Sequence, residues 1–241
     1  MIWHFLDSDF NTGEFNMNKD IELAQNCKSD EAYFRLYRWQ PYCISLGANQ
    51  SFDDIDLAKA KTDGIDVVKR PTGGRAILHA EEMTYSVILP LNYQYSPKEV
   101  YSLISTALIR GLDLYDHRLA ESELESVQPN FPILLEEASG VLCFASTAKN
   151  EVKFGGKKLI GSAQRKLNNI ILQHGSILCG TFHQKLADYL NTEAKSKELL
   201  RDELSSRTTE IETILNAKVD YGKLKECLVQ GFEQEWQIKW K

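Results

Sequence analysis

Two glycine-containing segments have residue types and spacing that could bind a small anionic or acyl ligand. The first, residues 69–79, holds Thr72-Gly73-Gly74 between Arg70 and Arg75 and ends at His79. Consecutive glycines permit positive φ and let a ligand approach the backbone. A strand that leads into such a turn, flanked by cations, can hold a phosphate or a bent acyl chain against backbone N–H groups. Taken alone, the motif equally describes a tight turn with solvated arginines.

The second segment, residues 155–165, begins with a double glycine followed by Lys157 and Lys158. The spacing of a phosphate-binding P-loop is absent, so a hairpin turn at Gly155-Gly156 explains the glycines better. Side chains of the strand that follows point alternately to its two faces. We therefore expect one of the two lysines to face whatever Gly73-Gly74 frames and the other to point away.

Cys143 lies in the apolar stretch Gly140-Val141-Leu142-Cys143-Phe144. The residues alone leave two interpretations open: a small buried hydrophobic residue, as most free cysteines are, or a nucleophile. The chain has five cysteines, an odd number without C-x-x-C spacing, which argues against a disulfide framework and a zinc knuckle. We expect no metal site, and burial accounts for the cysteines at 27, 43, 179 and 227.

Two histidines stand next to candidate ligand-binding segments. His174-Gly175 follows the strand-like run Ile170 to Gln173, and His79 closes the first segment. Each imidazole could serve as a base or as a hydrogen-bonded group of the core, and the sequence leaves both open.

Hydrophobic periodicity predicts the elements that must position these residues. The clearest is a helix from Ser96, where an N-cap serine, a proline at the first helical position and Glu99 form a capping box. Further helices are expected at 13–27, 52–61, 186–190 and 221–236, and strands at 1–9, 32–39, 42–46, 66–68 and 84–89. Short strands divided at Gly155-Gly156, Gly161 and Asn168-Asn169 are expected over 151–178, and a long connection over 116–140.

Grouped strands with helices at the ends predict an α+β fold rather than a doubly wound sheet. Without repeats or linkers, residues 1–241 are predicted to form one domain. The net charge of -6 argues against a generally basic nucleic-acid surface. No apolar run approaches the ~18 residues of a membrane span, and the start has no secretory-signal pattern, so a soluble, cytoplasmic protein is expected.

Taken in order, the segments resemble the family of lipoate-protein ligases and octanoyltransferases, which includes the biotin-protein ligase catalytic domain. The family's arginine-rich Thr-Gly-Gly motif ending in histidine is similar to Lys69 to His79. Its Gly-x-Lys-apolar-x-Gly-Ser-Ala segment is similar to Gly156 to Ala163, and its Gln-His-Gly segment to Gln173 to Leu178. Three ordered motifs are more specific than any one of them.

The resemblance implies a mixed β-sheet flanked by helices, shared with class II aminoacyl-tRNA synthetase cores. It also implies a site in which the Thr-Gly-Gly turn and the Gly-Ser-Ala strand clasp an acyl chain. The substrate-binding residues that it implies are Arg70, Thr72, Gly73, Gly74, His79, Gly161, Ser162, Ala163, His174 and Gly175. Lys158, and not Lys157, matches the family's single essential lysine. Lys69 stands where the family has a first arginine, so a forked hydrogen-bonding role is in doubt there.

Two chemistries occur in this family. Ligases activate a free acid with ATP, whereas transferases take an acyl group from acyl carrier protein and pass it through a cysteine. Cys143-Phe144 resembles the Cys-Phe of the transferases that load the glycine cleavage H protein, and Glu151 stands where ligases usually have aspartate. Both points favour transfer. A nearby ammonium lowers a thiol pKa, and Lys158 is the candidate for that role.

The resemblance thus implies an octanoyltransferase that uses Cys143 and Lys158 as catalytic residues. Octanoyl would move from acyl carrier protein to a lysine of a lipoyl-domain protein, such as glycine cleavage H protein, without a cofactor. The main alternative is an ATP-dependent lipoate-protein ligase, which would need ATP and Mg²⁺ and would be indifferent to Cys143→Ala. A second alternative is a non-catalytic module that binds acyl carrier protein.

Overall fold

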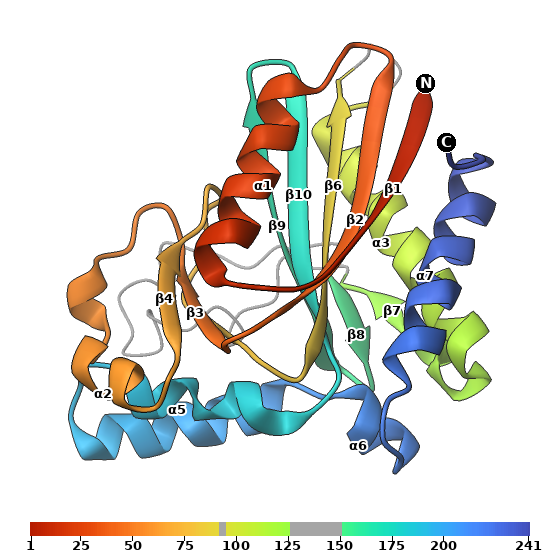
Figure 1. Ribbon diagram of the computed structural model, residues 1–241. Helices are drawn as coiled ribbons and strands as arrows, with labels where there is room; N and C mark the ends of the chain where they lie inside the picture. Colours follow the sequence, from red (N-terminus) through yellow and green to blue (C-terminus); the bar gives the residue numbers. More distant parts are fainter. Residues whose placement is uncertain (92–94, 126–150) are drawn as a thin grey trace.

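The computed structural model describes residues 1–91, 95–125 and 151–241. Within them, one large sheet has the strand order β1-β2-β6-β10-β9-β8-β7 (Figure 1). Its strands are β1 (Ile2–Asn11), β2 (Glu31–Trp39), β6 (Glu82–Pro90), β7 (Glu123–Leu124), β8 (Val152–Phe154), β9 (Lys157–Leu167) and β10 (Ile170–Leu178). Strands β1 and β2 are parallel and the other neighbours are antiparallel. The sheet is therefore mixed, as expected.

A smaller sheet has the order β4-β3-β5, formed by Asp66–Lys69, Cys43–Leu46 and Ile77–His79. Strand β3 pairs in parallel with β4 and antiparallel with β5. The chain between β4 and β5 carries Thr72-Gly73-Gly74. The turn motif is thus held at the edge of a separate small sheet, beside the large one (Figure 1).

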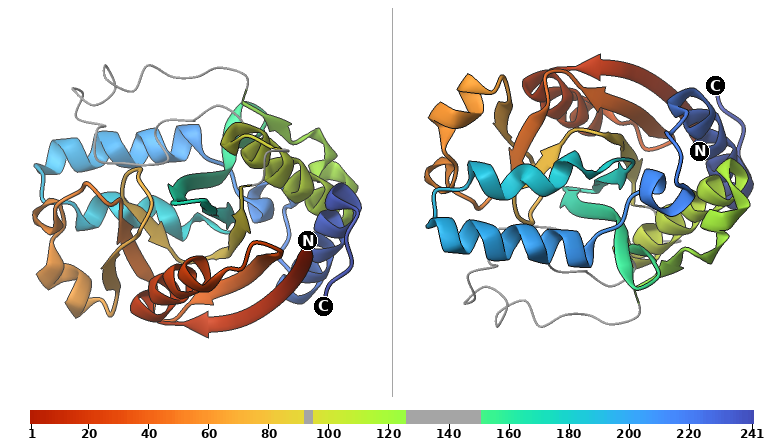
Figure 2. Two further views of the ribbon diagram at one scale, coloured as in Figure 1. Left: turned by 90° about the horizontal axis from the view of Figure 1, so that it is seen from above. Right: turned by 90° about the horizontal axis from the view of Figure 1, so that it is seen from below.

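Helices cover both faces of the large sheet. Helix α1 (Gly13–Asn26) lies on one face, while α3 (Pro97–Tyr115) and α7 (Tyr221–Trp236) lie together on the other (Figures 1 and 2). The remaining helices are α2 (Leu57–Thr62), α5 (Ala194–Arg207) and α6 (Ile211–Leu215), with 3-10 segments at Phe52–Asp54, His117–Glu121 and Thr181–Tyr189. The predicted arrangement, a mixed sheet flanked by helices, is confirmed.

The face toward α3 and α7 is the apolar core. Phe34 of β2 stacks on Phe232 of α7 with ring centroids 3.8 Å apart, and both side chains are fully buried. The two helices cross at Gly111 and Gly231, where a Cβ on Gly231 would come within 2.5 Å of the Ala107 carbonyl oxygen. Close backbone contact at this crossing therefore requires glycine.

The opposite face, toward α1, carries buried polar and charged groups. Asp20 of α1 and Arg35 of β2 are both fully buried and form an ion pair of 2.9 Å. Because unpaired buried charges are very costly, such groups occur where they are paired and hydrogen-bonded. A functional site is therefore expected on this polar face of the sheet.

Three local predictions were wrong. Residues 52–61 form two pieces because Asp56 caps a new helix, its side chain accepting from the Lys59 N–H. Gly161 does not divide the strand, since β9 continues through it with Gly161 paired to Ser176. Residues 186–189 belong to a 3-10 segment that ends at Tyr189, and not to an α-helix, and Leu190 follows as its C-cap. The capping box at Ser96 and the turns at Gly155-Gly156 and Asn168-Asn169 are confirmed.

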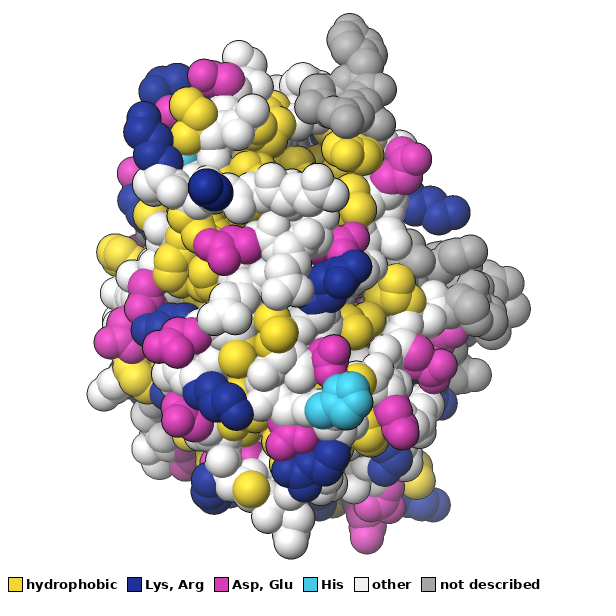
Figure 3. All heavy atoms as spheres, turned by 90° about the vertical axis from the view of Figure 1, so that its right-hand side faces the viewer, with side chains coloured by type: hydrophobic (Ala, Val, Ile, Leu, Met, Phe, Trp, Pro, Cys, Tyr) yellow, Lys and Arg dark blue, Asp and Glu magenta, His cyan; other side chains and the backbone are white. Residues whose placement is uncertain are grey.

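The surface over α3 and α7 has acidic and basic side chains interspersed (Figure 3). This pattern matches the modest net charge of -6. In the described parts of the chain, no helix is both long enough and apolar enough to span a bilayer.

Candidate functional site

A hollow lies on the polar face of the large sheet, between α1, the small sheet and strands β9 and β10. Of the residues expected to bind substrate, Arg70, His79, Gly161, Ser162, Ala163, His174 and Gly175 line it. All three sequence motifs therefore meet at one place. Thr72, Gly73, Gly74 and Lys158 do not line the hollow. Thr72 and Lys158 are buried, and the two glycines are exposed.

The other residues of the wall were not among the predicted substrate-binding residues. These residues are Met17, Tyr37, Trp39, Ser45, Ile77, Thr84 and Ser176. Tyr37, Thr84 and Ser176 share one face of the sheet, since Tyr37 pairs with Thr84 and the strands beside them continue that register. Alternation within 32–39 could have placed Tyr37 and Trp39 on a common face, but only the strand order shows that this face borders the hollow.

The first buried hydrogen-bond chain runs from α1 to the Thr-Gly-Gly turn. His174 Nδ1 lies 3.1 Å from Asp20 Oδ2, and His174 Nε2 lies 2.6 Å from Thr72 Oγ1. A carboxylate can only accept, so Nδ1 carries the proton that His174 donates to Asp20. Burial lowers the pKa of His174 and favours the neutral ring, so Nε2 accepts from the Thr72 hydroxyl. This chain fixes the turn to the centre of the sheet.

Asp20 is the anchor of that chain. Its Oδ1 accepts from Arg35 Nη1 at 2.9 Å and from Ser86 Oγ at 2.8 Å, and its Oδ2 also accepts from Tyr37. Burial alone would raise the pKa of Asp20, but the His174 hydrogen bond and the Arg35 charge lower it below its ordinary value. The carboxylate therefore stays ionised and holds its four hydrogen-bond donors in place.

A second buried chain runs through His79. Glu82 Oε1 accepts from His79 Nδ1 at 2.8 Å and from Ser176 Oγ at 2.8 Å. On the other side of the ring, His79 Nε2 lies 2.7 Å from Ser45 Oγ. The ring also stacks on Trp39, with centroids 4.1 Å apart. These contacts fix the orientation of the His79 ring in the wall of the hollow.

The Arg70 side chain stabilises the Thr72-Gly73-Gly74 turn by hydrogen bonds to backbone carbonyls. Its guanidinium donates to the carbonyl oxygens of Ser45 at 2.8 Å, Gly73 at 3.0 Å and Arg75 at 2.7 Å. A planar fork with several N–H donors can bridge carbonyls in this way, and a lysine cannot. Lys69, by contrast, is exposed and its ammonium lies over the Phe52 ring. The departure from the family pattern at position 69 therefore leaves the hydrogen bonds of Arg70 intact.

Gly47 and Gly74 permit the close approach of the turn to the small sheet. Gly74 has φ +93°, in the region that favours glycine. A Cβ on Gly47 would lie 1.9 Å from the Gly74 carbonyl oxygen. A side chain on Gly47 would therefore displace the turn that borders the hollow.

Lys158 is 1% exposed, and its Nζ lies 3.0 Å from Glu151 Oε2. Glu151 Oε1 accepts from the Ser162 N–H at 3.3 Å, so the pair is tied to the Gly-Ser-Ala segment. Lys157 is exposed and points elsewhere, toward the Ser205 carbonyl. The two lysines therefore point to opposite sides of β9, as strand alternation predicts, but Lys158 does not reach the wall of the hollow.

Cys143 lies outside the described residues, so its place in the fold stays a prediction. Burial raises the thiol pKa of Cys27 to about 11 and that of Cys179 to about 12. Burial also raises the pKa of Cys43 and Cys227. These four thiols are poor sources of thiolate, the reactive form of cysteine, and the interpretation of them as structural residues agrees with this.

The fold is that of lipoate-protein ligases. A lipoate protein ligase from Thermoplasma acidophilum with bound lipoic acid covers 100% of this chain at 18% identity, with a TM-score of 0.75 and 88% of its own length matched. Lipoate-protein ligase A bound with ATP is similar, with a TM-score of 0.76. At such identities the likeness concerns the fold alone.

Sequence comparison identifies the family. The family model for the lipoyl protein ligase A/B catalytic domain matches residues 12–233, and the chain belongs to this family. "Octanoyltransferase LipM" of Clostridioides difficile is 33% identical over 92% of this chain and 86% of its own length. The protein of the same name from Macrococcus caseolyticus is 33% identical over 99% of this chain and 88% of its own.

Proposed function

We propose that this chain is an octanoyltransferase of lipoate biosynthesis. The observation that carries the proposal is the meeting of three motifs around one hollow, in a chain similar over nearly its full length to octanoyltransferases. In this proposal the hollow is the slot that binds the acyl chain, here called the acyl slot. Its wall combines apolar side chains such as Met17 and Ile77 with a few fixed polar groups, a usual composition for small-molecule sites.

The first step acylates Cys143. Its thiolate attacks the carbonyl carbon of an octanoyl thioester, and the bond from that carbon to the donor sulfur breaks. The new thioester joins octanoyl to Cys143, and the donor leaves as a thiol once it takes up a proton. Backbone N–H groups near Gly74 or Ala163 would stabilise the oxyanion. The Lys158 ammonium, held by Glu151, supplies the positive charge that favours a thiolate.

The second step transfers octanoyl to the acceptor. The neutral amine of a target lysine attacks the Cys143 thioester, an amide bond forms and the sulfur leaves as thiolate. The proton released from the amine passes to a water molecule, because the Lys158 ammonium has no acceptor site. The Cys143 thiolate and the empty acyl slot are then restored for another cycle.

The partners follow from this chemistry. The donor is octanoyl-acyl carrier protein and the acceptor is a lipoyl-domain protein, for which glycine cleavage H protein is the first candidate. One of the similar structures is a bipartite lipoate protein ligase of T. acidophilum described with its E2 lipoyl domain, which supports a lipoyl domain as the class of acceptor. The proposal needs no ATP or Mg²⁺ and places the protein in the cytoplasm.

Intact-mass spectrometry after incubation with octanoyl-acyl carrier protein tests the proposal. Wild type should gain one octanoyl group that hydroxylamine removes, and Cys143→Ala should gain none. Cys227→Ala is the matched control, because that thiol is buried and its pKa is raised; it should acylate as wild type does.

A ligase gives a different outcome. Pyrophosphate release from ATP with free octanoate or lipoate, unchanged in Cys143→Ala, would reject the transferase. Absence of an adduct together with unmodified acceptor protein would reject catalysis altogether.

A further inference from the structure

A hydroxyl, an imidazole and a carboxylate form a hydrogen-bonded row in the wall of the acyl slot. Ser45 of β3 and His79 of β5 line the slot, and Glu82 is buried beside His79. Ser45 Oγ lies 2.7 Å from His79 Nε2, and His79 Nδ1 lies 2.8 Å from Glu82 Oε1. These three residues are here called the serine triad. The proposed transfer through Cys143 and Lys158 uses none of them.

The hydrogen bonds of Glu82 define which nitrogen of His79 carries the proton. Burial alone would raise the pKa of Glu82, but the neighbouring His79 and the hydrogen bonds from Thr84 and Ser176 lower it. A carboxylate only accepts, so Nδ1 carries the proton and donates to Glu82. With one proton on the ring, Nε2 accepts from the Ser45 hydroxyl. This is the tautomer in which an imidazole can act as base toward a serine.

The His79 ring is held in this orientation from its face and its edge. It stacks on Trp39, with ring centroids 4.1 Å apart and an interplanar angle of 14°. Trp39 Nε1 donates to Thr84 Oγ1 at 2.7 Å, and the Thr84 hydroxyl donates to Glu82 Oε1. A general base must stay within hydrogen-bond reach of the proton that it takes. The network provides this condition.

A fixed positive charge lies beside the Ser45 hydroxyl. Arg70 Nη1 donates to Ser45 Oγ at 3.2 Å and to the Ser45 carbonyl oxygen at 2.8 Å. A guanidinium is always charged in a protein. In a buried site such a cation stabilises the negative charge that develops when an oxygen attacks a carbonyl.

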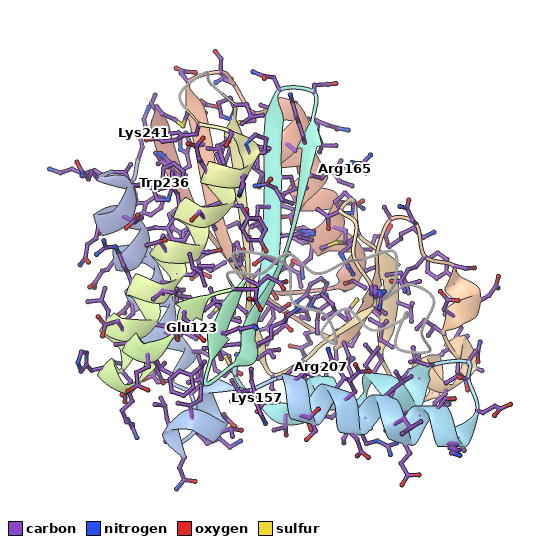
Figure 4. All side chains as sticks on the ribbon, turned by 180° about the vertical axis from the view of Figure 1, so that it is seen from behind. Glu123, Lys157, Arg165, Arg207, Trp236 and Lys241 are labelled. Atoms are coloured by element: carbon purple, nitrogen blue, oxygen red, sulfur yellow. The ribbon has the colours of Figure 1, made fainter. Side chains whose placement is uncertain are left out.

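The serine triad lies away from Lys158. Ser176, whose hydroxyl donates to the carboxylate of the triad, pairs with Gly161 of β9. Gly161 comes three residues after Lys158, about 10 Å along an extended strand. Figure 4 shows Lys157 and Arg165 at opposite ends of this strand, and Gly161 lies between them. The two reaction centres are therefore separate.

The position of Ser45 limits the substrates that it can meet. Ser45 is fully buried, so its hydroxyl is approached from the slot that it lines. In the proposed transfer, a carrier-bound acyl group holds its carbonyl beside Lys158, away from the serine triad. A small free ester can enter the slot whole. Because Met17 and Ile77 also line the slot, an uncharged, apolar ester suits it best.

We propose that Ser45 is the nucleophile and His79 the base of a second centre in the acyl slot, which hydrolyses small apolar carboxylic esters. Glu82 is its positioning residue. Ser45 Oγ attacks the ester carbonyl carbon, and its proton passes to His79 Nε2. The bond from this carbon to the alkoxy oxygen then breaks, and the alcohol leaves with the proton from His79. An acyl ester on Ser45 remains.

Water completes the cycle. A water molecule gives a proton to His79 Nε2 and attacks the acyl ester of Ser45. The carboxylic acid leaves, and Ser45 Oγ recovers the proton from His79. The net reaction converts one ester and one water into an acid and an alcohol. It uses no cofactor and neither reactive residue of the proposed transfer.

Covalent labelling tests the nucleophile in the unaltered chain. Methanesulfonyl fluoride, a small reagent for activated serines, should form a sulfonate ester on Ser45, and peptide mass mapping locates it. A serine that serves only as a hydrogen-bonded group of the core does not react with this reagent. Labelling of other residues without Ser45 would overturn the proposal, and this result needs no variant to fold.

Hydrolysis of 4-nitrophenyl acetate is measured in a Cys143→Ala background, so that the thiol of the transfer step takes no part. Adding Ser45→Ala should lower kcat/KM by about 100-fold or more. Ser105→Ala is the matched control, because Ser105 is 1% exposed but lies on α3, outside the slot. It should stay within about twofold. A folded Ser45→Ala with unchanged hydrolysis would overturn the proposal.

Glu82→Gln in the same background tests the positioning residue. The amide leaves no negative charge beside the imidazolium that forms during attack. We expect kcat to fall by about tenfold or more while KM stays within about threefold. A change in KM with kcat unchanged would contradict the role of Glu82.

This inference and the proposed transfer fail separately. Octanoylation of Cys143 together with an unreactive Ser45 would reject only the esterase centre. Labelling of Ser45 and Ser45-dependent hydrolysis, with no octanoylation of Cys143, would support the esterase centre and reject the proposed transfer.

Discussion

Lys158 and Glu151 form a buried ion pair, with Nζ 3.0 Å from Oε2 and side chains only 1% and 4% exposed. The pair lies beside the Gly161-Ser162-Ala163 segment, because the same carboxylate accepts from the Ser162 N–H. A buried ammonium is costly unless an acid compensates it. Glu151 therefore provides the counter-charge for Lys158 where the proposed chemistry requires a cation.

Removal of the ammonium alone should be strongly destabilising. Lys158→Met leaves the Glu151 carboxylate buried without its cation, and about 3–5 kcal/mol of unfolding free energy should be lost. Urea denaturation measures this loss of unfolding free energy. Lys157→Met, at an exposed neighbour, should stay within about 0.5 kcal/mol of wild type.

The double variant Lys158→Met/Glu151→Leu removes both charges and should recover most of that loss. It should still be inactive in octanoyl transfer. Equal instability of single and double variants would contradict the ion-pair account, and retained transfer would contradict a catalytic Lys158.

Arg70→Lys should weaken the site although the charge is conserved. A lysine cannot donate at once to the Ser45, Gly73 and Arg75 carbonyls. We expect kcat/KM for the acyl donor to fall by about tenfold or more, a loss of about 1.4 kcal/mol in transition-state stabilisation. Lys69→Arg at the exposed neighbour is the control, and a similar loss there would argue against the special position of Arg70.

Gly47→Ala should displace the Thr72-Gly73-Gly74 turn. The new Cβ would lie 1.9 Å from the Gly74 carbonyl oxygen, so the backbone would have to move to remove the clash. Overpacking of this kind costs about 1–3 kcal/mol, visible as a lower thermal midpoint. Gly73→Ala has no heavy atom within 4 Å of its Cβ and should be nearly neutral in stability. A stable Gly47→Ala with normal acylation would show that the turn adapts freely.

Stability should fall as the pH is lowered from about 6.5. Burial lowers the pKa of His174 and of His183 below the ordinary value of 6.5. The unfolded chain regains that ordinary value and binds more protons than the folded protein below it, so protonation favours unfolding. The slope is up to about 1.4 kcal/mol per pH unit for each histidine. Asp20 and Glu82, whose pKa values are lowered, lose their contribution only below about 4.

Urea midpoints between pH 8 and pH 5 measure this dependence. The midpoint should be nearly constant above pH 7 and should decrease toward pH 5, and His183→Gln should reduce the decrease. A flat profile down to pH 5 would mean that the buried rings gain protons without cost.

Much of this protein could be deduced from its sequence. The alternation of residues 32–39, the capping box at Ser96 and the paired glycines at 155–156 depend on neighbours within a few positions, so the strand, the helix start and the turn were predicted correctly. The three motifs predicted that Arg70, Gly161 and His174 belong together, and they do. The burial of one lysine of the Lys157-Lys158 pair also follows from strand periodicity.

Only the tertiary structure decided which groups complete the site. Asp20, Glu82 and Trp39 have no distinctive spacing in the sequence, yet they anchor or stack on the two histidines. Asp20 and Trp39 contact histidines that lie far away along the chain, so these contacts depend on strand order and on the packing of α1, which local patterns do not encode. Glu82 is only three residues from His79, but their hydrogen bond depends on the path of the chain between β5 and β6. Glu151 and Lys158 are seven positions apart and both were singled out in the sequence, but only the structure shows that they form a buried ion pair.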